Sequence, residues 1–221
     1  MSKHAQKSGG KGSLNQIQLW VNNDPNTLNQ SIENAIPALA GDPINWHSPL
    51  QSHSYSEYRD GDFLDLLGLS MYKSALQSFW PKGGPQWDAL AKTKSGKIIL
   101  VEAKANETEL RSSCQAKAAS SISRIESSLD ATKRHYGINP NKDWMIGFYQ
   151  YANRLAHLYF LSELCKVETY LVFIHFLDDK SVNGPQTEAE WQKALHPMYA
   201  QLGLANNWPQ NPVANIFIKA K

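Results

Sequence analysis

The sequence predicts a single α/β domain built around a mixed β-sheet. Three observations support this fold class. Two apolar segments, 86–93 and 97–105, flank the sequence Lys-Ser-Gly and predict a β-hairpin. Segments 168–177 and 213–220 are rich in β-branched and aromatic residues, which is typical of buried strands. The stretches between them show the three-to-four spacing of helices with one buried face.

The composition is that of a globular protein. Of the 221 residues 42% are hydrophobic and 10% aromatic, which excludes a disordered chain. No apolar run approaches the roughly 20 residues that span a bilayer, so no membrane association is expected. Cys114 and Cys165 lie far apart without metal-ligand spacing and are expected to be reduced thiols of a cytoplasmic protein.

The first thirteen residues differ in charge from the rest of the chain. They contain Lys3, Lys7 and Lys11, no acidic residue and no apolar segment of the kind found in secretory signals. We interpret residues 1–13 as a flexible basic tail. The net charge of +2 comes from this tail, since taking its three lysines from the 22 basic residues leaves 19 against 20 acidic ones. A nucleic-acid partner would therefore be bound by a local patch and not by a global field.

The N-terminal part is expected to be helical. Residues 14–23 predict a helix capped by Ser13, and a second helix follows with Asp24 as cap and Pro25 in its first position. Together they form an N-terminal helical extension, 14–46, of a single domain that spans 14–221. Residues 41–54 are expected to be a loop, and 55–67 a helix ended by Gly68. Part of segment 74–80 is compatible with a first strand.

The second half alternates between helices and strands. A long helix is predicted over 107–136, from the apolar spacing of its residues, and another over 144–165. A strand over 168–177, a helix over 187–202 and a last strand over 213–220 complete the order. This order of elements is that of a single α/β domain with a mixed sheet.

The hairpin carries charged residues whose placement depends on its turn. Alternate residues of a strand share a face, so Glu102 and Lys104 point the same way. A two-residue turn would set Asp88 opposite Ala103, whereas a three-residue loop, 94–96, would set it opposite Glu102. Three-residue loops place a left-handed residue last, and Gly96 occupies that position. We therefore predict that Asp88, Glu102 and Lys104 lie together.

Two carboxylates and a lysine at the end of a buried strand suit a site for a hard cation. Magnesium prefers oxygen ligands, and a bound metal can activate water and stabilise charge on a phosphoryl oxygen. The structural alternative is an ion pair between Lys104 and either carboxylate, which would need no metal.

The segments "PQWDAL" and "ILVEAKA" resemble the hairpin of the PD-(D/E)XK nuclease superfamily, in which an Asp is followed by an apolar strand that ends in Glu-X-Lys. The resemblance covers about residues 54–176. It implies a restriction-endonuclease-like three-layer core with a central mixed sheet flanked by helices. The chain departs from the motif at the proline, because Trp87 precedes Asp88 and the proline is Pro85.

The resemblance also implies roles for these residues. Asp88, Glu102 and the backbone carbonyl of Ala103 would bind Mg²⁺, with Mn²⁺ as a substitute, and Lys104 would orient or deprotonate the attacking water. The implied activity is hydrolysis of phosphodiester bonds in nucleic acid, DNA rather than RNA, as an endonuclease or exonuclease. The family resemblance leaves room for a homodimer.

Two further residues are candidates for this site. Many family members place an acid before the hairpin, and Glu57 is the candidate, with Asp60 as its substitute. The alternative is that Ser54 and Glu57 form a capping box, which needs no catalysis. Gln115, expected on the helix after the hairpin, is a second-rank candidate whose alternative is an ordinary polar position on a helix flank.

The helix predicted over 144–165 carries a polar stripe. Gln150, Asn153, Arg154 and His157 recur at positions i, i+3, i+4 and i+7. The stripe is either a solvated face or the lining of a cleft, where Gln150, Asn153 and Arg154 would bind substrate and the fork of Arg154 would meet a phosphate.

Three functional hypotheses follow. The first is a metal-dependent nuclease that uses Asp88, Glu102 and Lys104. The second is a non-cleaving member of the same fold that binds nucleic acid or protein and retains the ion pair. The third is an unrelated α/β enzyme that uses the polar stripe of residues 150–157. Zinc is not expected, because the seven histidines show no metal-ligand spacing.

Overall fold

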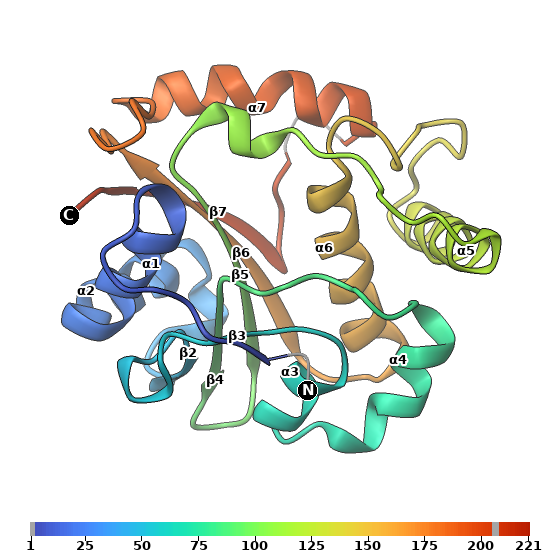
Figure 1. The fold of residues 1–221 in the computed structure, drawn as a ribbon, viewed down its shortest axis with the longest axis horizontal. Helices are drawn as coiled ribbons and strands as arrows, with labels where there is room; N and C mark the ends of the chain where they lie inside the picture. The colour runs from blue at the N-terminus through green and yellow to red at the C-terminus, as the bar shows by residue number, and fades with distance from the viewer. Residues whose placement is uncertain (1–2, 205–207) are drawn as a thin grey trace.

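The computed structural model describes residues 3–204 and 208–221. Its main sheet has five strands in the order β2-β4-β5-β6-β7 and is open (Figure 1). Strands β2, β4 and β5 pair antiparallel, whereas β5, β6 and β7 pair parallel. The strands are β2 (Ile44–Ser48), β4 (Ala89–Thr93), β5 (Ile98–Lys104), β6 (Thr169–Leu177) and β7 (Val213–Lys219).

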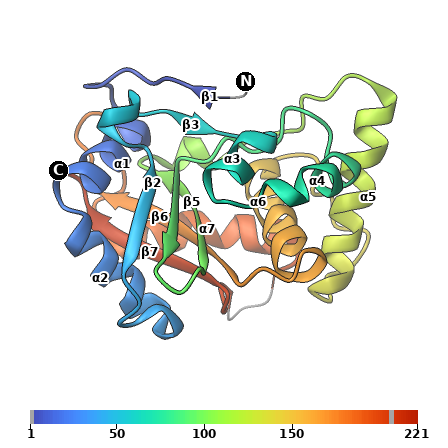
Figure 2. The same ribbon diagram turned by 90° about the horizontal axis from the view of Figure 1, so that it is seen from below.

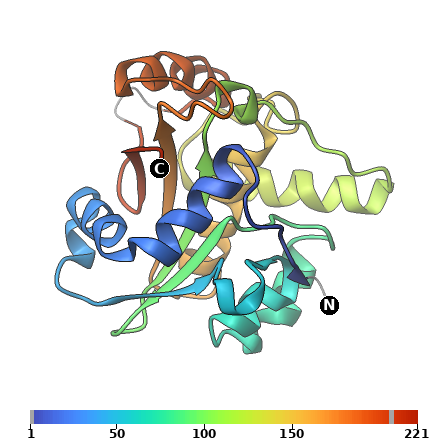
Figure 3. The same cartoon turned by 60° about the vertical axis from the view of Figure 1, so that its left-hand side comes forward.

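Helices cover both faces of this sheet and make three layers. One face packs against α1 (Gly12–Asn23) and α2 (Pro25–Ala35), which lie on one side of the sheet in Figures 1 and 3. The remaining helices lie on the side of the other face (Figure 2). These are α3 (Asp60–Leu66), α4 (Lys73–Phe79), α5 (Ala119–His135), α6 (Tyr149–Tyr159) and α7 (Glu188–Leu202). The predicted α/β class, with a mixed sheet between two layers of helices, is confirmed.

β5 is the central strand and is buried on both faces. Its side chains alternate between the two apolar cores: Ile98 and Leu100 pack toward α6, and Ile99 and Val101 pack toward α1 and α2. Such a strand can be apolar on both sides because no side chain in its middle meets water. Only at its carboxyl end do charged residues appear on the α6 side.

The N-terminal segment makes specific contacts where we predicted a flexible tail. β1 (Lys3–His4) pairs antiparallel with β3 (Glu57–Tyr58) and forms a separate two-stranded sheet. The side chain of Gln6 donates a hydrogen bond of 2.9 Å to Glu57. Helix α1 begins at Gly12 with Lys11 as its N-cap, so the prediction of Ser13 as cap is wrong. The hydroxyl of Ser13 donates to Glu109 instead, at 2.6 Å.

Two short elements differ from the sequence prediction. Residues 44–48, expected to lie in a loop, form the edge strand β2, which is held by its pairing with β4. Residues 44–46, assigned to the helical extension 14–46, therefore belong to a strand of the main sheet. The segment 74–80, part of which was compatible with a strand, lies largely in α4, which spans Lys73–Phe79. Both segments are short, and their conformation follows from tertiary contacts more than from propensity.

The helix predicted over 107–136 is divided into three parts. Glu107–Leu110 is a 3-10 turn, residues 111–118 are not helical, and α5 begins only at Ala119. The non-helical part is held by backbone hydrogen bonds from Ser112 to Gly147, at 2.9 Å, and from Cys114 to Met145, at 2.8 Å. These bonds across the chain replace the local bonds that a helix would have made.

The neighbouring helix predictions are corrected in the same way. α6 begins at Tyr149 and not at residue 144, and a π-helical turn, Phe160–Leu164, follows it. α3 begins at Asp60 and not at residue 55, because residues 57–58 are extended in β3. Other 3-10 turns lie at Pro37–Leu39, Gln51–His53 and Ser70–Tyr72.

Several local predictions are confirmed. The side chain of Asp24 caps α2 by accepting from the Thr27 amide, and Pro25 takes the first helical position. Strands β6 and β7 lie within one residue of the predicted bounds. Cys114 and Cys165 are free thiols.

Within the described residues, none of the helices combines the length and apolarity needed to cross a membrane.

Candidate active site

The hairpin of β4 and β5 has the register that brings its acids together. Leu90 pairs with Leu100 and Ala89 with Val101, and the same register sets Asp88 opposite Glu102. Thr93 and Lys97 close the loop with a hydrogen bond of 2.9 Å, which leaves three loop residues. Gly96 ends the loop with a φ of 102°, a conformation that other residues rarely adopt. The predicted three-residue loop and its consequence for Asp88 are confirmed.

The two carboxylates and Lys104 lie at the carboxyl end of β5. Asp88 accepts a hydrogen bond of 2.7 Å from the Ala103 amide, so its carboxylate is anchored to the neighbouring strand. Lys104 donates to Glu102, with 2.5 Å between Nζ and Oε1, and to Gln150 of α6 at 3.1 Å. Lys104 therefore links the strand to the polar stripe on α6.

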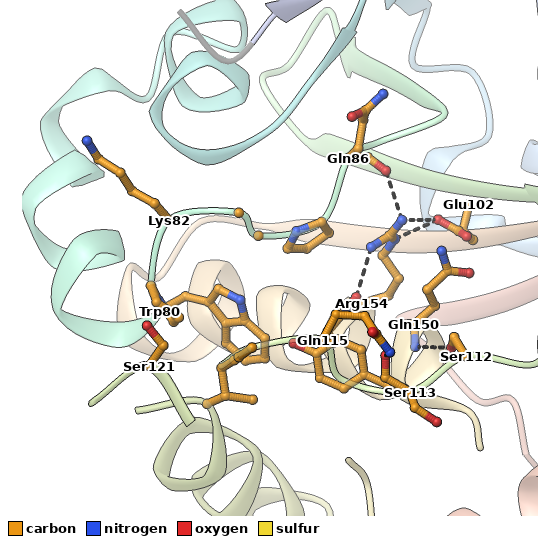
Figure 4. Close-up of a pocket in the computed structure, with 18 of the residues that line it drawn as sticks. Trp80, Lys82, Gln86, Glu102, Ser112, Ser113, Gln115, Ser121, Gln150 and Arg154 are labelled. Atoms are coloured by element: carbon orange, nitrogen blue, oxygen red, sulfur yellow. Dashed lines mark hydrogen bonds and ion pairs between the residues drawn. The ribbon is translucent and has the colours of Figure 1, made fainter. Parts of the chain in front are cut away.

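Arg154 occupies the other side of Glu102. Its Nε lies 2.6 Å from Glu102 Oε2, and its terminal nitrogen pairs with the same oxygen (Figure 4). The guanidinium also donates to Asn153 and to the backbone carbonyl of Gln86, both at 2.8 Å, and stacks over Trp87 at 4.9 Å. Arg154 is 3% exposed. It holds the metal-ligand candidate Glu102 and, through the Gln86 carbonyl, the segment that leads into Asp88. The phosphate contact considered for Arg154 from the sequence stays a prediction.

Glu57 joins this cluster from β3. Its neighbour Tyr58 forms a bridge to Trp87, and this pairing places Glu57 beside Gln86, whose side-chain amide donates to the Glu57 carboxylate. Ser54 lies in a left-handed conformation outside any helix, so the capping-box alternative is wrong. Glu57 instead lines the cavity described below.

The buried charges shift one another's pKa. Burial and the neighbouring Glu102 carboxylate raise the pKa of Asp88 well above its usual range. Burial also raises the pKa of Glu57, against the hydrogen bonds from Gln86 and Gln6. Burial opposes ionisation of Glu102, but Arg154 and Lys104 outweigh it and lower the pKa of that carboxyl. Three carboxyl groups thus lie near two cationic side chains. The two cations favour ionisation of Glu102, whereas Asp88 and Glu57 are the carboxyls whose pKa is raised.

A cavity of about 880 Å³ opens above these residues. Asp88, Glu102 and Lys104 line its floor together with Glu57. Two chain segments, 80–86 and 112–118, supply walls, and α6 contributes Gln150, Asn153 and Arg154. The polar stripe is therefore not a solvated face, since Asn153 and Arg154 are buried. The hairpin end and three of the four stripe residues line one cavity, whereas His157 does not. This removes the contrast on which the hypothesis of an unrelated enzyme was based.

Of the remaining candidates, Gln115 lines the cavity, whereas Asp60 and His157 do not. Gln115 lines the cavity from the non-helical segment 111–118 and is exposed, and its amide donates to Ser113. Asp60 does not line this cavity. Its carboxylate accepts from the amides of Gly83 and Gly84 and fastens the wall segment 80–86. His157 is buried, donates from Nδ1 to the Asn153 carbonyl at 2.9 Å, and touches Trp80 edge-on.

Sequence reasoning did not identify all of the lining residues. Gln86 lies two positions before Asp88, and the alternation of a strand could have placed both on one face. The hydroxyl of Ser112 accepts from the backbone amide of Gln150 at 2.8 Å. Nothing in the sequence indicated that Ser112 lines a cavity, because a helix was predicted there. Trp80 and Tyr149 line the cavity as well, and neither was singled out from the sequence.

The donor set that could bind a metal is small. Among the described residues, no group of three or more His, Cys, Asp and Glu side chains is arranged to hold an ion. The candidate ligands are Asp88, Glu102 and the carbonyl of Ala103. In an extended strand the amide and carbonyl of one residue point to the same side, so the Ala103 carbonyl faces the side on which its amide meets Asp88.

Comparison with models of protein families, with curated proteins and with solved structures gives no match.

Proposed function

We propose that the protein is a metal-dependent hydrolase of phosphodiester bonds in nucleic acid, DNA rather than RNA, with a restriction-endonuclease-like fold. One observation supports this proposal above the others. Asp88, directly before β4, accepts a hydrogen bond from the Ala103 amide next to Glu102, and both acids line one cavity with Lys104. A mixed sheet with acids at the carboxyl end of a central strand and helices on both faces agrees with that fold.

The residues on this floor fit a magnesium or manganese ion. Asp88 receives one hydrogen bond, from the Ala103 amide, and the acids outnumber the cations around it, so an added divalent charge would relieve their repulsion. Two carboxylates and a carbonyl suit Mg²⁺, which keeps several of its waters. When bound, the ion would polarise a phosphoryl oxygen and activate a water molecule.

The protein's own residues would position the reacting groups. Lys104 is held by Glu102 and Gln150 and lines the cavity. Its neighbours Glu102 and Asp88 raise the pKa of Lys104 despite its burial, which keeps the ammonium form. Lys104 therefore serves better to orient water and stabilise charge on a phosphate than to remove a proton. Arg154 is a positioning residue that holds Glu102 in place and ionised.

A second candidate function is supported by a different observation. Both oxygens of Glu102 already have cationic partners, Lys104 on Oε1 and Arg154 on Oε2. A network satisfied in this way is also what a non-cleaving member of the same fold would retain, as a module that binds nucleic acid or protein. Such a protein would bind no divalent cation.

Cleavage assays distinguish the two functions. Plasmid and single-stranded substrates are incubated with Mg²⁺ or Mn²⁺, and we expect the wild type to cut them. Asp88→Asn and Lys104→Ala should reduce cleavage at least about 100-fold, the scale seen when one charge-stabilising group is removed from an active site. The matched controls are Asp130→Asn and Lys166→Ala, which change an acid and a lysine outside the cavity.

Each outcome has a definite meaning. Equal cleavage by wild type and both site variants would show that a contaminant cuts or that the site is elsewhere. Absence of cleavage, combined with no Mn²⁺ binding by calorimetry, would favour the non-cleaving alternative.

A further inference from the structure

The cavity over the carboxylates has the size of a small-molecule pocket. Its volume of about 880 Å³ lies within the roughly 300–1,000 Å³ of pockets that enclose a single ligand. Glu102, at the floor, is 2% exposed. The major groove of a DNA duplex alone is about 12 Å wide, and its phosphates are fixed on a stiff cylinder. A cavity of this size suits one or two nucleotides of a flexible strand better than a segment of rigid duplex.

The walls carry groups that suit an unpaired base. Tyr149 is partly exposed, and its ring lies nearly parallel to that of Trp80, with 6.5 Å between ring centroids and 30° between planes. Both residues line the cavity. Gln115 and Gln150 also line the cavity (Figure 4), where the Gln115 side chain donates to the Ser113 carbonyl and that of Gln150 accepts from Lys104. Aromatic rings and amides are the means by which proteins stack on unpaired bases and bond their edges.

The exposed positive charge at the cavity is sparse. Two exposed lysines line it, Lys82 from the segment 80–86 and Lys117 from the segment 112–118. Lys104 and Arg154 also line the cavity, and both form ion pairs with Glu102. A duplex presents one charge for every 1.7 Å or so, and proteins that follow it neutralise many phosphates. Two exposed lysines on different lining segments match a short stretch of one strand.

On this basis, and resting on the proposed function, we infer that the substrate is single-stranded nucleic acid, of which one or two unpaired nucleotides enter the cavity. A base contacts Tyr149, and the flanking phosphates meet Lys82 and Lys117. The scissile phosphate then lies over Asp88 and Glu102.

Binding measured without cleavage tests this inference. Fluorescence anisotropy is followed in EDTA with a labelled 12-nucleotide strand, as DNA and as RNA, and with the corresponding duplexes. We expect at least one single strand to bind tenfold or more tightly than its duplex. Lys82→Ala and Lys117→Ala should each lower the slope of log K against log salt by about 0.7, the value per phosphate of a single strand. Lys166→Ala, at an exposed lysine outside the cavity, should leave the slope unchanged.

Tyr149 gives an independent measurement. Tyr149→Ala should weaken binding of the single strand at least fivefold, whereas Tyr149→Phe, which keeps the ring and the fold, should bind as the wild type does. Equal or tighter binding of duplex, no binding of either form, or unchanged salt slopes in both lysine variants would overturn the inference. Because no divalent cation is present, these results are independent of cleavage, and a protein that cuts duplex DNA would support the proposed function while refuting this inference.

Discussion

The two faces of β5 differ in what they bury at the end of the strand. Toward α1 and α2, Ile99, Val101 and Ala103 are fully buried among apolar side chains. Toward α6, the apolar residues give way to Glu102 and Lys104. Glu102 is buried like the apolar residues that precede it in β5. Its charge is compensated by two cationic side chains, Lys104 and Arg154. Burial of apolar side chains on the first face stabilises the fold. Burial of charged side chains on the second face costs free energy, which the apolar burial offsets.

The largest test of this difference removes a partner from the charged face. Arg154→Ala leaves Glu102 buried with Lys104 as its one cationic partner, and removing a partner from a buried ion pair costs about 3–5 kcal/mol of unfolding free energy. Urea unfolding followed by tryptophan fluorescence measures the change. As control, Lys166→Ala removes the exposed pair with Glu163, for which at most about 1 kcal/mol is expected. A loss from Arg154→Ala as small as that of the control would show that the ion cluster is not tightly coupled.

The second test measures how the unfolding free energy depends on pH. Two buried histidines, His157 and His175, lie on the α6 side of the sheet and make this dependence large. Burial lowers the pKa of His157 to about 3 and that of His175 to about 4. Below the ordinary value of 6.5 the unfolded chain takes up protons that the folded protein does not, so stability is full above pH 6.5 and falls as the pH decreases. The raised pKa values of Asp88 and Glu57 act in the opposite direction and offset part of this loss.

A variant isolates the contribution of one histidine. His157→Phe keeps a ring among Phe63, Phe79 and Trp80 but cannot be protonated. Between pH 7 and pH 5 the variant should lose about 2 kcal/mol less of its unfolding free energy than the wild type loses. Urea unfolding at both pH values measures this difference. The same loss in both proteins would mean that His157 is protonated in the folded state.

The smallest change concerns the apolar face. Ile99→Val removes one methylene from the core against α1 and α2, and we expect a loss of about 0.5–1.5 kcal/mol in urea unfolding. Nucleic-acid binding and the pH dependence of stability should match those of the wild type, since the face carries no site. A change in binding comparable with that of Tyr149→Ala would show that the two faces are coupled through the strand.

Local signals in the sequence were enough for the hairpin. The apolar run 98–101, the glycine at position 96 and the alternation of the strand predicted the register of Asp88 and Glu102, because each depends on neighbouring residues alone. The stripe of α6 was predicted for the same reason, as its spacing is a property of any helix. What these signals could not tell was whether the stripe faces solvent or the cavity, since that depends on where the helix packs.

The non-helical segment 111–118 shows why other parts could not be predicted. Its composition allows a helix, but hydrogen bonds to Met145 and Gly147, more than thirty residues away, hold it beside α6. Glu57 is a similar case: its sequence suggests a helix start, whereas pairing of Tyr58 with Trp87 makes the backbone extended. In both, contacts between distant parts of the chain outweigh local propensity.

The sequence by itself determined the class of the fold, the register of the hairpin and the clustering of two acids with a lysine, because these follow from periodicity and turn chemistry. Only the tertiary structure decided that Arg154 is a partner of Glu102, that Glu57 reaches the cavity and that Tyr149 lines its wall. The reason is physical: a buried charge is stabilised by whichever opposite charge the packing brings to it, and no spacing along the chain specifies that partner.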